Sequence, residues 1–85
     1  MTWTLLHSSS LRAARYQEPE LVLELEFCDG AIHRYSRVPE RTFQELLRAE
    51  SKGKFFNLHI RKTFPSHRIR RAGANSISGV STAGK

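Results

Sequence analysis

The sequence predicts a small α+β domain, a three-stranded antiparallel meander covered by two C-terminal helices in the order β-β-β-α-α. Alternating apolar residues in the N-terminal half indicate strands, and apolar residues at helical spacing follow from residue 38 onward. The 85 residues suffice for one domain at most. A chain this short buries only about 60% of the surface that it exposes when unfolded, so its core is small.

The strand signal is clearest in LVLELEF, residues 21–27, where the leucines and the phenylalanine face one side. The pattern predicts a half-buried strand whose glutamates, Glu24 and Glu26, lie on a solvated face. The stretch CDG that follows is a hairpin signal, and AIHRYSRV, residues 31–38, is expected to form the return strand. A weaker pattern in SLRAARY, residues 10–16, indicates the third strand.

The length of the hairpin loop decides which side chains join the leucines. A two-residue loop would place Arg34 among them, and burying an unpaired guanidinium is costly. A three-residue loop places His33 and Tyr35 on the leucine face and sets Arg34 opposite Glu24 in an exposed, mildly favourable pair. The sequence therefore favours the three-residue loop, with Tyr35 packed at the core and its hydroxyl seeking a partner near an edge.

The first helix is predicted in VPERTFQELLRAE, residues 38–50. Pro39 suits the first helical position, where its missing N–H is not needed. The stripe formed by Phe43, Leu46 and Leu47 has helical spacing and should cover the leucine face of the sheet.

The stretch SKGKFFNLHIRKTF, residues 51–64, fits both a strand and a helix by its apolar spacing. Ser51 suits an N-cap, which favours a helix that begins near Lys52. Gly53 weakens such a helix by about 1 kcal/mol relative to alanine. In the helix Phe56 faces the core, whereas Phe55 is either a core residue or a stacking surface.

Charge is distributed unevenly along the chain. Residues 1–50 carry six Lys/Arg and eight acids, a net charge of −2, whereas residues 51–85 carry eight Lys/Arg and no acid. The total of +6, gathered in one segment, is typical of a protein that binds a polyanion. The alternative is a solvated basic face with no partner. The folded domain is expected to span residues 1–66, and residues 67–85 to form a basic, then Gly/Ser/Ala-rich, disordered tail.

The stretch GAIHRYSRVPERTFQELLRAESKGKFFNLHIR resembles the KTSC domain, a short bacterial domain at the C-terminus of some lysyl-tRNA synthetases that also occurs alone. The resemblance runs from about Ser8 to Phe64. The family's central Tyr-x-Tyr motif corresponds here to His33-Arg34-Tyr35, so histidine replaces the first aromatic residue. The resemblance implies the α+β fold and, through the synthetase, RNA binding.

The basic segment supplies the candidate binding residues, because cations neutralise phosphates and a helix N-terminus favours an anion. The candidates for contacts with nucleic acid are Lys52, Lys54, Asn57, Arg61, Lys62, Arg68, Arg70 and Arg71. The candidates for base stacking or for a hydrogen bond at the base edge are Tyr35, Phe55, His33 and His59.

Other functions have weaker support in the sequence. The four histidines and single cysteine lack metal-ligand spacing, so no metal or other cofactor is expected. A nuclease-like enzyme that uses His59 and Tyr35 is a weak alternative, and a protein-interaction module with an acidic partner is a stronger one. The expectation is a non-enzymatic module that binds RNA, a structured RNA such as tRNA among the candidates.

The expected cellular location follows from features that the sequence lacks. A lone Cys28 cannot form an intramolecular disulfide, which fits the cytoplasm. The sequence shows neither a signal peptide nor an apolar run that could span a membrane, and a monomer is expected.

Overall fold

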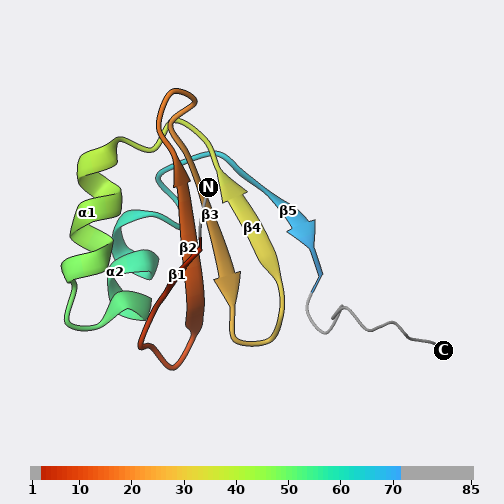
Figure 1. Cartoon of the computed structure of the whole chain (residues 1–85), viewed down its shortest axis with the longest axis vertical. Helices are drawn as coiled ribbons and strands as arrows, with labels where there is room; N and C mark the ends of the chain where they lie inside the picture. Colours follow the sequence, from red (N-terminus) through yellow and green to blue (C-terminus); the bar gives the residue numbers. More distant parts are fainter. Residues whose placement is uncertain (1–2, 72–85) are drawn as a thin grey trace, which may run out of the picture.

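The computed structural model describes residues 3–71, which form a five-stranded antiparallel sheet with two helices on one face (Figure 1). The sheet order is β1-β2-β3-β4-β5, and both helices lie in the connection between β4 and β5. The elements are β1 (Thr4–Leu5), β2 (Leu11–Gln17), β3 (Val22–Phe27), β4 (Ile32–Tyr35), α1 (Glu40–Arg48), α2 (Lys52–His59) and β5 (Ser66–Arg70). The predicted α+β class is confirmed, but the sheet has five strands where the sequence predicted three.

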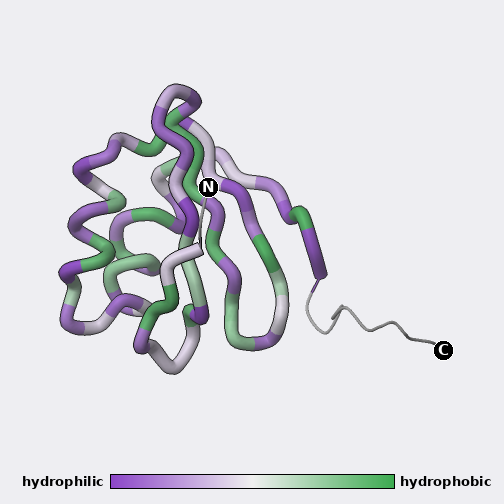
Figure 2. Tube along the Cα trace, in the orientation of Figure 1, coloured by the Kyte–Doolittle hydropathy of each residue, from purple (hydrophilic) through white to green (hydrophobic). Residues whose placement is uncertain are grey.

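The two additional strands lie at the edges of the sheet, and neither has a strong sequence pattern. β1 has two residues, and β5 has the sequence SHRIR, which is largely hydrophilic along its trace (Figure 2). β5 pairs with β4 through backbone hydrogen bonds, which do not depend on apolar alternation. The folded domain therefore extends past the boundary predicted at residue 66, to Arg70 at least. The predicted disordered stretch at residues 72–85 lies outside the described residues.

The hairpin between β3 and β4 has the predicted three-residue loop. The Phe27 N–H donates to the Ala31 carbonyl over 2.8 Å, and Gly30 has φ 96°. In this register Leu25 lies opposite His33 and Leu23 opposite Tyr35, as expected.

The core lies between the sheet and the two helices. Leu23 and Leu25 are fully buried, and α1 contributes Leu46 while α2 contributes Phe56, with Ile60 directly after it. These positions confirm the predicted orientation of both helices. Leu21 differs, because β3 begins only at Val22 and Leu21 has φ 57° with its side chain exposed.

The helix starts agree with the sequence to within one residue. Ser51 caps α2, and its Oγ accepts from the Lys54 N–H at 3.3 Å. Pro39 was predicted at the first helical position of α1, but it is the N-cap with extended backbone, and the helix begins at Glu40. Val38, the residue before this cap, is fully buried in the core.

Glu24 is buried, although the sequence predicted a solvated side chain. It lies on the sheet face that carries no helix, and only 1% of its surface is exposed. Arg15 pairs with one carboxylate oxygen through Nε at 2.9 Å, and Arg34 pairs with the other through Nε at 3.0 Å and Nη2 at 2.8 Å. Burial raises the pKa of Glu24, but the hydrogen bonds and charges of both arginines outweigh it and lower the pKa. The predicted pair between Glu24 and Arg34 exists, but it buries the Glu24 carboxylate where the sequence predicted an exposed pair.

Candidate nucleic-acid interface

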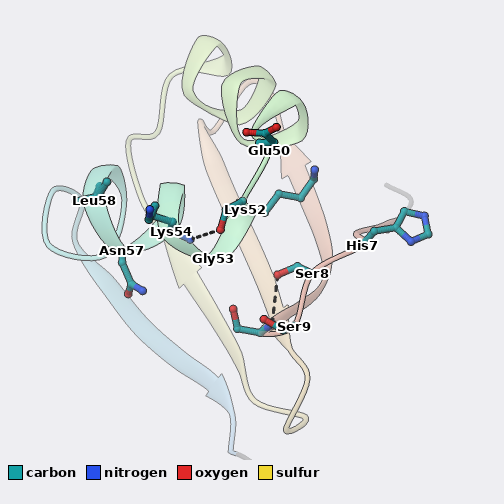
Figure 3. Close-up of a pocket in the computed structure, with 11 residues that line it drawn as sticks. His7, Ser8, Ser9, Glu50, Lys52, Gly53, Lys54, Asn57 and Leu58 are labelled. Carbon is teal, nitrogen blue, oxygen red and sulfur yellow. Dashed lines mark hydrogen bonds between the residues drawn. The ribbon is translucent and has the colours of Figure 1, made fainter.

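Asn57 of α2 lines two surface hollows. We call the first the aromatic hollow; its volume is about 450 Å³. Its lining residues are Phe27, His33, Tyr35, Phe56, Asn57, Arg61 and Ser66. We call the second the serine hollow; its volume is about 590 Å³ (Figure 3). It lies between the N-terminal turn of α2 and the Ser8–Ser10 loop.

Four rings form the floor of the aromatic hollow. Phe27 meets the edge of His33 at 5.5 Å between centroids and that of Phe56 at 5.3 Å. Tyr35 meets Phe56 edge-on at 5.6 Å between centroids, and its ring is inclined by 29° to that of His33 at 6.5 Å. These edge-to-face contacts hold the rings in fixed positions, and both β4 rings lie on the core side, as the hairpin register predicted.

Tyr35 and Tyr16 are both buried, but only one hydroxyl has a partner. The Tyr16 hydroxyl donates to the Val38 carbonyl at 2.6 Å. The Tyr35 hydroxyl has no hydrogen-bond partner among residues 3–71. Every fully buried side-chain nitrogen or oxygen in that range does have a partner. The Tyr35 hydroxyl must therefore retain access to solvent, and Tyr35 is one of the residues that line the aromatic hollow.

Burial raises the pKa of Tyr35 to about 12, against a smaller lowering effect of the Arg61 charge. The phenol is therefore neutral at physiological pH and can donate a hydrogen bond to a ligand. Arg61 and Tyr35 both line the aromatic hollow.

The rim of the aromatic hollow is polar and positively charged. Asn57 comes from α2, Arg61 from the turn after it, and Ser66 from the first position of β5. Arg68 lies opposite His33 in the β4–β5 register. Within residues 3–71 no acidic side chain lines this hollow. An anion at the rim would meet cations without competition from carboxylates.

The structure separates residues that the sequence placed on one helix face. Lys54, Asn57 and Arg61 were expected along a continuous helix, but α2 ends at His59. The Arg61 N–H then bonds to the Phe56 carbonyl at 2.9 Å, which turns the chain. Lys54 consequently lines the serine hollow and Arg61 the aromatic hollow, with Asn57 between them.

The serine hollow is less suited to an anion. Glu50 contributes a negative charge, and the Lys52 ammonium donates to the Ala49 carbonyl at 2.9 Å. The Ser8 hydroxyl already accepts from two backbone N–H groups of its own loop. A Cβ on Gly53 would lie 2.5 Å from the Ser10 Oγ, so glycine permits the close approach of helix and loop.

The remaining predicted residues lie apart from the aromatic hollow. Phe55 and His59 contact each other at 4.7 Å between ring centroids and line a third hollow with Lys54. Arg70 is occupied on the opposite sheet face, where it donates to the Gly30 carbonyl at 2.8 Å and to Glu26 at 2.7 Å. It is therefore a structural residue in this fold.

Two further predicted cations are exposed, Lys62 in the turn after α2 and Arg71 after β5. The structure thus gathers His33, Tyr35, Asn57 and Arg61 at one place. Ser66 could not be found from the sequence, because the strand that positions it was not recognised.

Residues 3–71 contain no helix that is long and apolar enough to cross a bilayer. In the same range no three His, Cys, Asp or Glu side chains gather closely enough to hold a metal ion.

Residues 7–64 match the KTSC domain. The chain belongs to the KTSC domain family. It is 48% identical over 52 residues to a protein of Stutzerimonas stutzeri, which covers 61% of this chain and 73% of that one. It is 41% identical over 59 residues to a protein of Tsukamurella paurometabola, covering 69% of this chain and 88% of that one.

The chain is also similar to part of a larger protein and to a solved structure. A lysine–tRNA ligase of Nostoc is 39% identical over 56 residues, which cover 66% of this chain and 10% of that enzyme. The crystal structure of a KTSC domain protein from Yersinia pestis has a TM-score of 0.77 at 31% identity, covering 80% of this chain and 96% of that one. All lining residues of the aromatic hollow except Ser66 fall within the KTSC match.

Proposed function

We propose that this KTSC domain is a small, non-enzymatic RNA-binding module whose contact surface is centred on the aromatic hollow. The observation that carries the proposal is the combination of an aromatic floor with a cationic rim that no acidic side chain of residues 3–71 enters. RNA-binding proteins commonly combine these two features, because cations bind phosphates and rings stack on bases.

The charge distribution supports a polyanionic ligand. The basic segment from Lys52 to Arg71 carries seven Lys/Arg and no acid. Five of these cations have no salt-bridge or hydrogen-bond partner for their side chains among residues 3–71: Lys54, Arg61, Lys62, Arg68 and Arg71. They lie on α2 and β5 or directly after them, and they can bind phosphates without first breaking a protein contact.

The similarity to part of a lysine–tRNA ligase adds support of a different kind. That enzyme acts on tRNA, and a domain shared with it is well placed to contact RNA. This argument rests on analogy, whereas the hollow and its charges belong to this chain.

The first experiment measures how RNA affinity depends on salt. For single-stranded RNA, log K is expected to fall by about 0.7 per phosphate contact for each unit of log salt. The double variant Arg61→Ala/Arg68→Ala should flatten this slope by up to about 1.4, because it removes two candidate contacts beside the aromatic hollow. Both side chains are exposed, so the melting temperature should stay within a few degrees of the parent value.

The matched control removes the same charge elsewhere. Arg41→Ala/Arg48→Ala takes two exposed arginines from α1, away from both hollows. This variant should keep most of the parent slope. Equal loss in both double variants would show that net charge alone binds RNA, and no binding at low salt would refute the proposal. Shortened RNA on a gel would instead indicate a nuclease, and a partner that RNA cannot displace would indicate an acidic protein.

A further inference from the structure

The aromatic hollow is more specific than an electrostatic surface requires. Phosphate binding needs only cations, yet this hollow presents the partly exposed rings of Phe27 and His33 beside the polar groups of Asn57 and Ser66. Its volume of about 450 Å³ falls in the range of small-ligand pockets, which combine an apolar wall with a few convergent polar groups.

We infer that the aromatic hollow takes one unstacked nucleobase, so that the domain prefers single-stranded to double-stranded RNA. The inference rests on the proposed function and specifies the form of RNA. A base offers a flat π-face for the rings and a polar edge for hydrogen bonds. The floor and rim of the hollow provide both kinds of partner.

The Tyr35 hydroxyl is accessible and is available to a polar group of a ligand in the aromatic hollow. Tyr16 has a similar burial and uses its hydroxyl within the protein, whereas the Tyr35 hydroxyl has no partner among residues 3–71. Asn57 adds an exposed amide with donor and acceptor groups, and Ser66 adds a hydroxyl. These groups can bind the edge of an extruded base.

Cations on two elements continue the surface beyond the base. Arg61 lies on the rim and Arg68 lies opposite His33 on β5, so a strand whose base enters the hollow finds positive charge for its phosphates. A duplex cannot satisfy this geometry without unpairing, because its bases are stacked and its major groove is deep and narrow. It would retain only the phosphate contacts.

The test compares a short mixed-sequence single strand of RNA with the same strand annealed to its complement. The single strand should bind more tightly by between about 5-fold and about 150-fold, the contribution of one stacked base. His33→Ala should remove most of this preference, and His33→Phe should keep it, because phenylalanine restores a ring. Binding of the duplex should change little in either variant.

A pair of tyrosine variants tests the hydroxyl without altering the ring. Tyr35→Phe should weaken single-strand binding by about 3-fold to about 10-fold, the range for one hydrogen bond, with no loss of stability. Tyr16→Phe should lower the melting temperature, because the Val38 carbonyl loses its donor, and leave RNA binding unchanged.

The outcomes separate the inference from the function on which it rests. Equal affinity for the single strand and the duplex, or an undiminished preference in His33→Ala, would overturn the base-binding inference and leave RNA binding intact. Failure of both RNAs to bind would overturn both. A preference that disappears in His33→Ala and persists in His33→Phe would support the inference.

Discussion

The buried Glu24 permits a quantitative prediction about stability. In Glu24→Gln the side chain keeps its size, but the amide offers one acceptor oxygen where the carboxylate offers two. Its NH₂ group must then face Arg15 or Arg34, so that a donor meets a donor. We call Glu24 and its two arginine partners, Arg15 and Arg34, the array. The variant loses the charge-assisted contact to one of these arginines and leaves that guanidinium without its partner.

The expected loss follows from the exposure of the two arginines. Removing one partner of a fully buried ion pair costs about 3–5 kcal/mol. The side chains of Arg15 and Arg34 are 30% and 41% exposed, so water can partly replace the lost oxygen. We expect a decrease of about 2–3 kcal/mol in the free energy of unfolding, a large fraction of the stability of a small domain. The melting temperature should fall by about 8–24 °C.

Thermal melts followed by circular dichroism provide the measurement, with Glu26→Gln as the matched control. Glu26 has one partner, Arg70, and both side chains are partly exposed, so this variant should lose at most about 1 kcal/mol. A Glu24→Gln protein that melts within a few degrees of the parent, or no lower than Glu26→Gln, would show that the array does not stabilise the fold.

The pH dependence provides a second check on the same array. The folded-state pKa of Glu24 is lowered, so its contribution to stability is complete above the unfolded pKa of about 4.3. The contribution disappears as the pH falls through the lower folded-state value. The difference in melting temperature between the parent and Glu24→Gln should therefore be largest near neutral pH and shrink in acid.

Two further predictions concern Tyr35 and Gly53. Tyr35→Ala should lose about 3–5 kcal/mol and unfold or seriously loosen the domain, and a thermal melt close to that of the parent would show that the side chain is not a core residue. The pKa of Tyr35 is raised to about 12, so its contribution to stability is complete below pH 10 and disappears as the pH rises towards 12, which denaturation measured at several alkaline pH values can follow. Gly53→Ala should stabilise α2 by up to about 1 kcal/mol if the exposed Ser10 hydroxyl rotates away, and a lower midpoint in urea would show that it cannot.

The sequence alone determined the parts of this protein that depend on neighbours in the chain. The hairpin register followed from the cost of burying Arg34, and the start of α2 followed from the Ser51 cap. Alternation identified β3, and apolar spacing identified the inward faces of both helices. The concentration of positive charge after residue 50 is likewise a property of the sequence.

Only the tertiary structure decided which charges are free and which are occupied. Glu24 is covered because β2 and β4 place an arginine on each side of it, and strand alternation contains no information about those neighbours. The sequence likewise predicted Arg70 as a binding residue. β5 instead places Arg70 beside Glu26, 44 positions away in the chain, and the two side chains form a hydrogen bond.

The candidate site depends on contacts between segments that are distant in the chain. The aromatic hollow requires β4, α2 and β5 together, and β5 forms because β4 offers an unpaired edge. Backbone hydrogen bonds across an edge place few demands on side chains, so SHRIR carried no strand pattern. Ser66 could not be predicted as a site residue for the same reason, because its place depends on the pairing of β5 with β4.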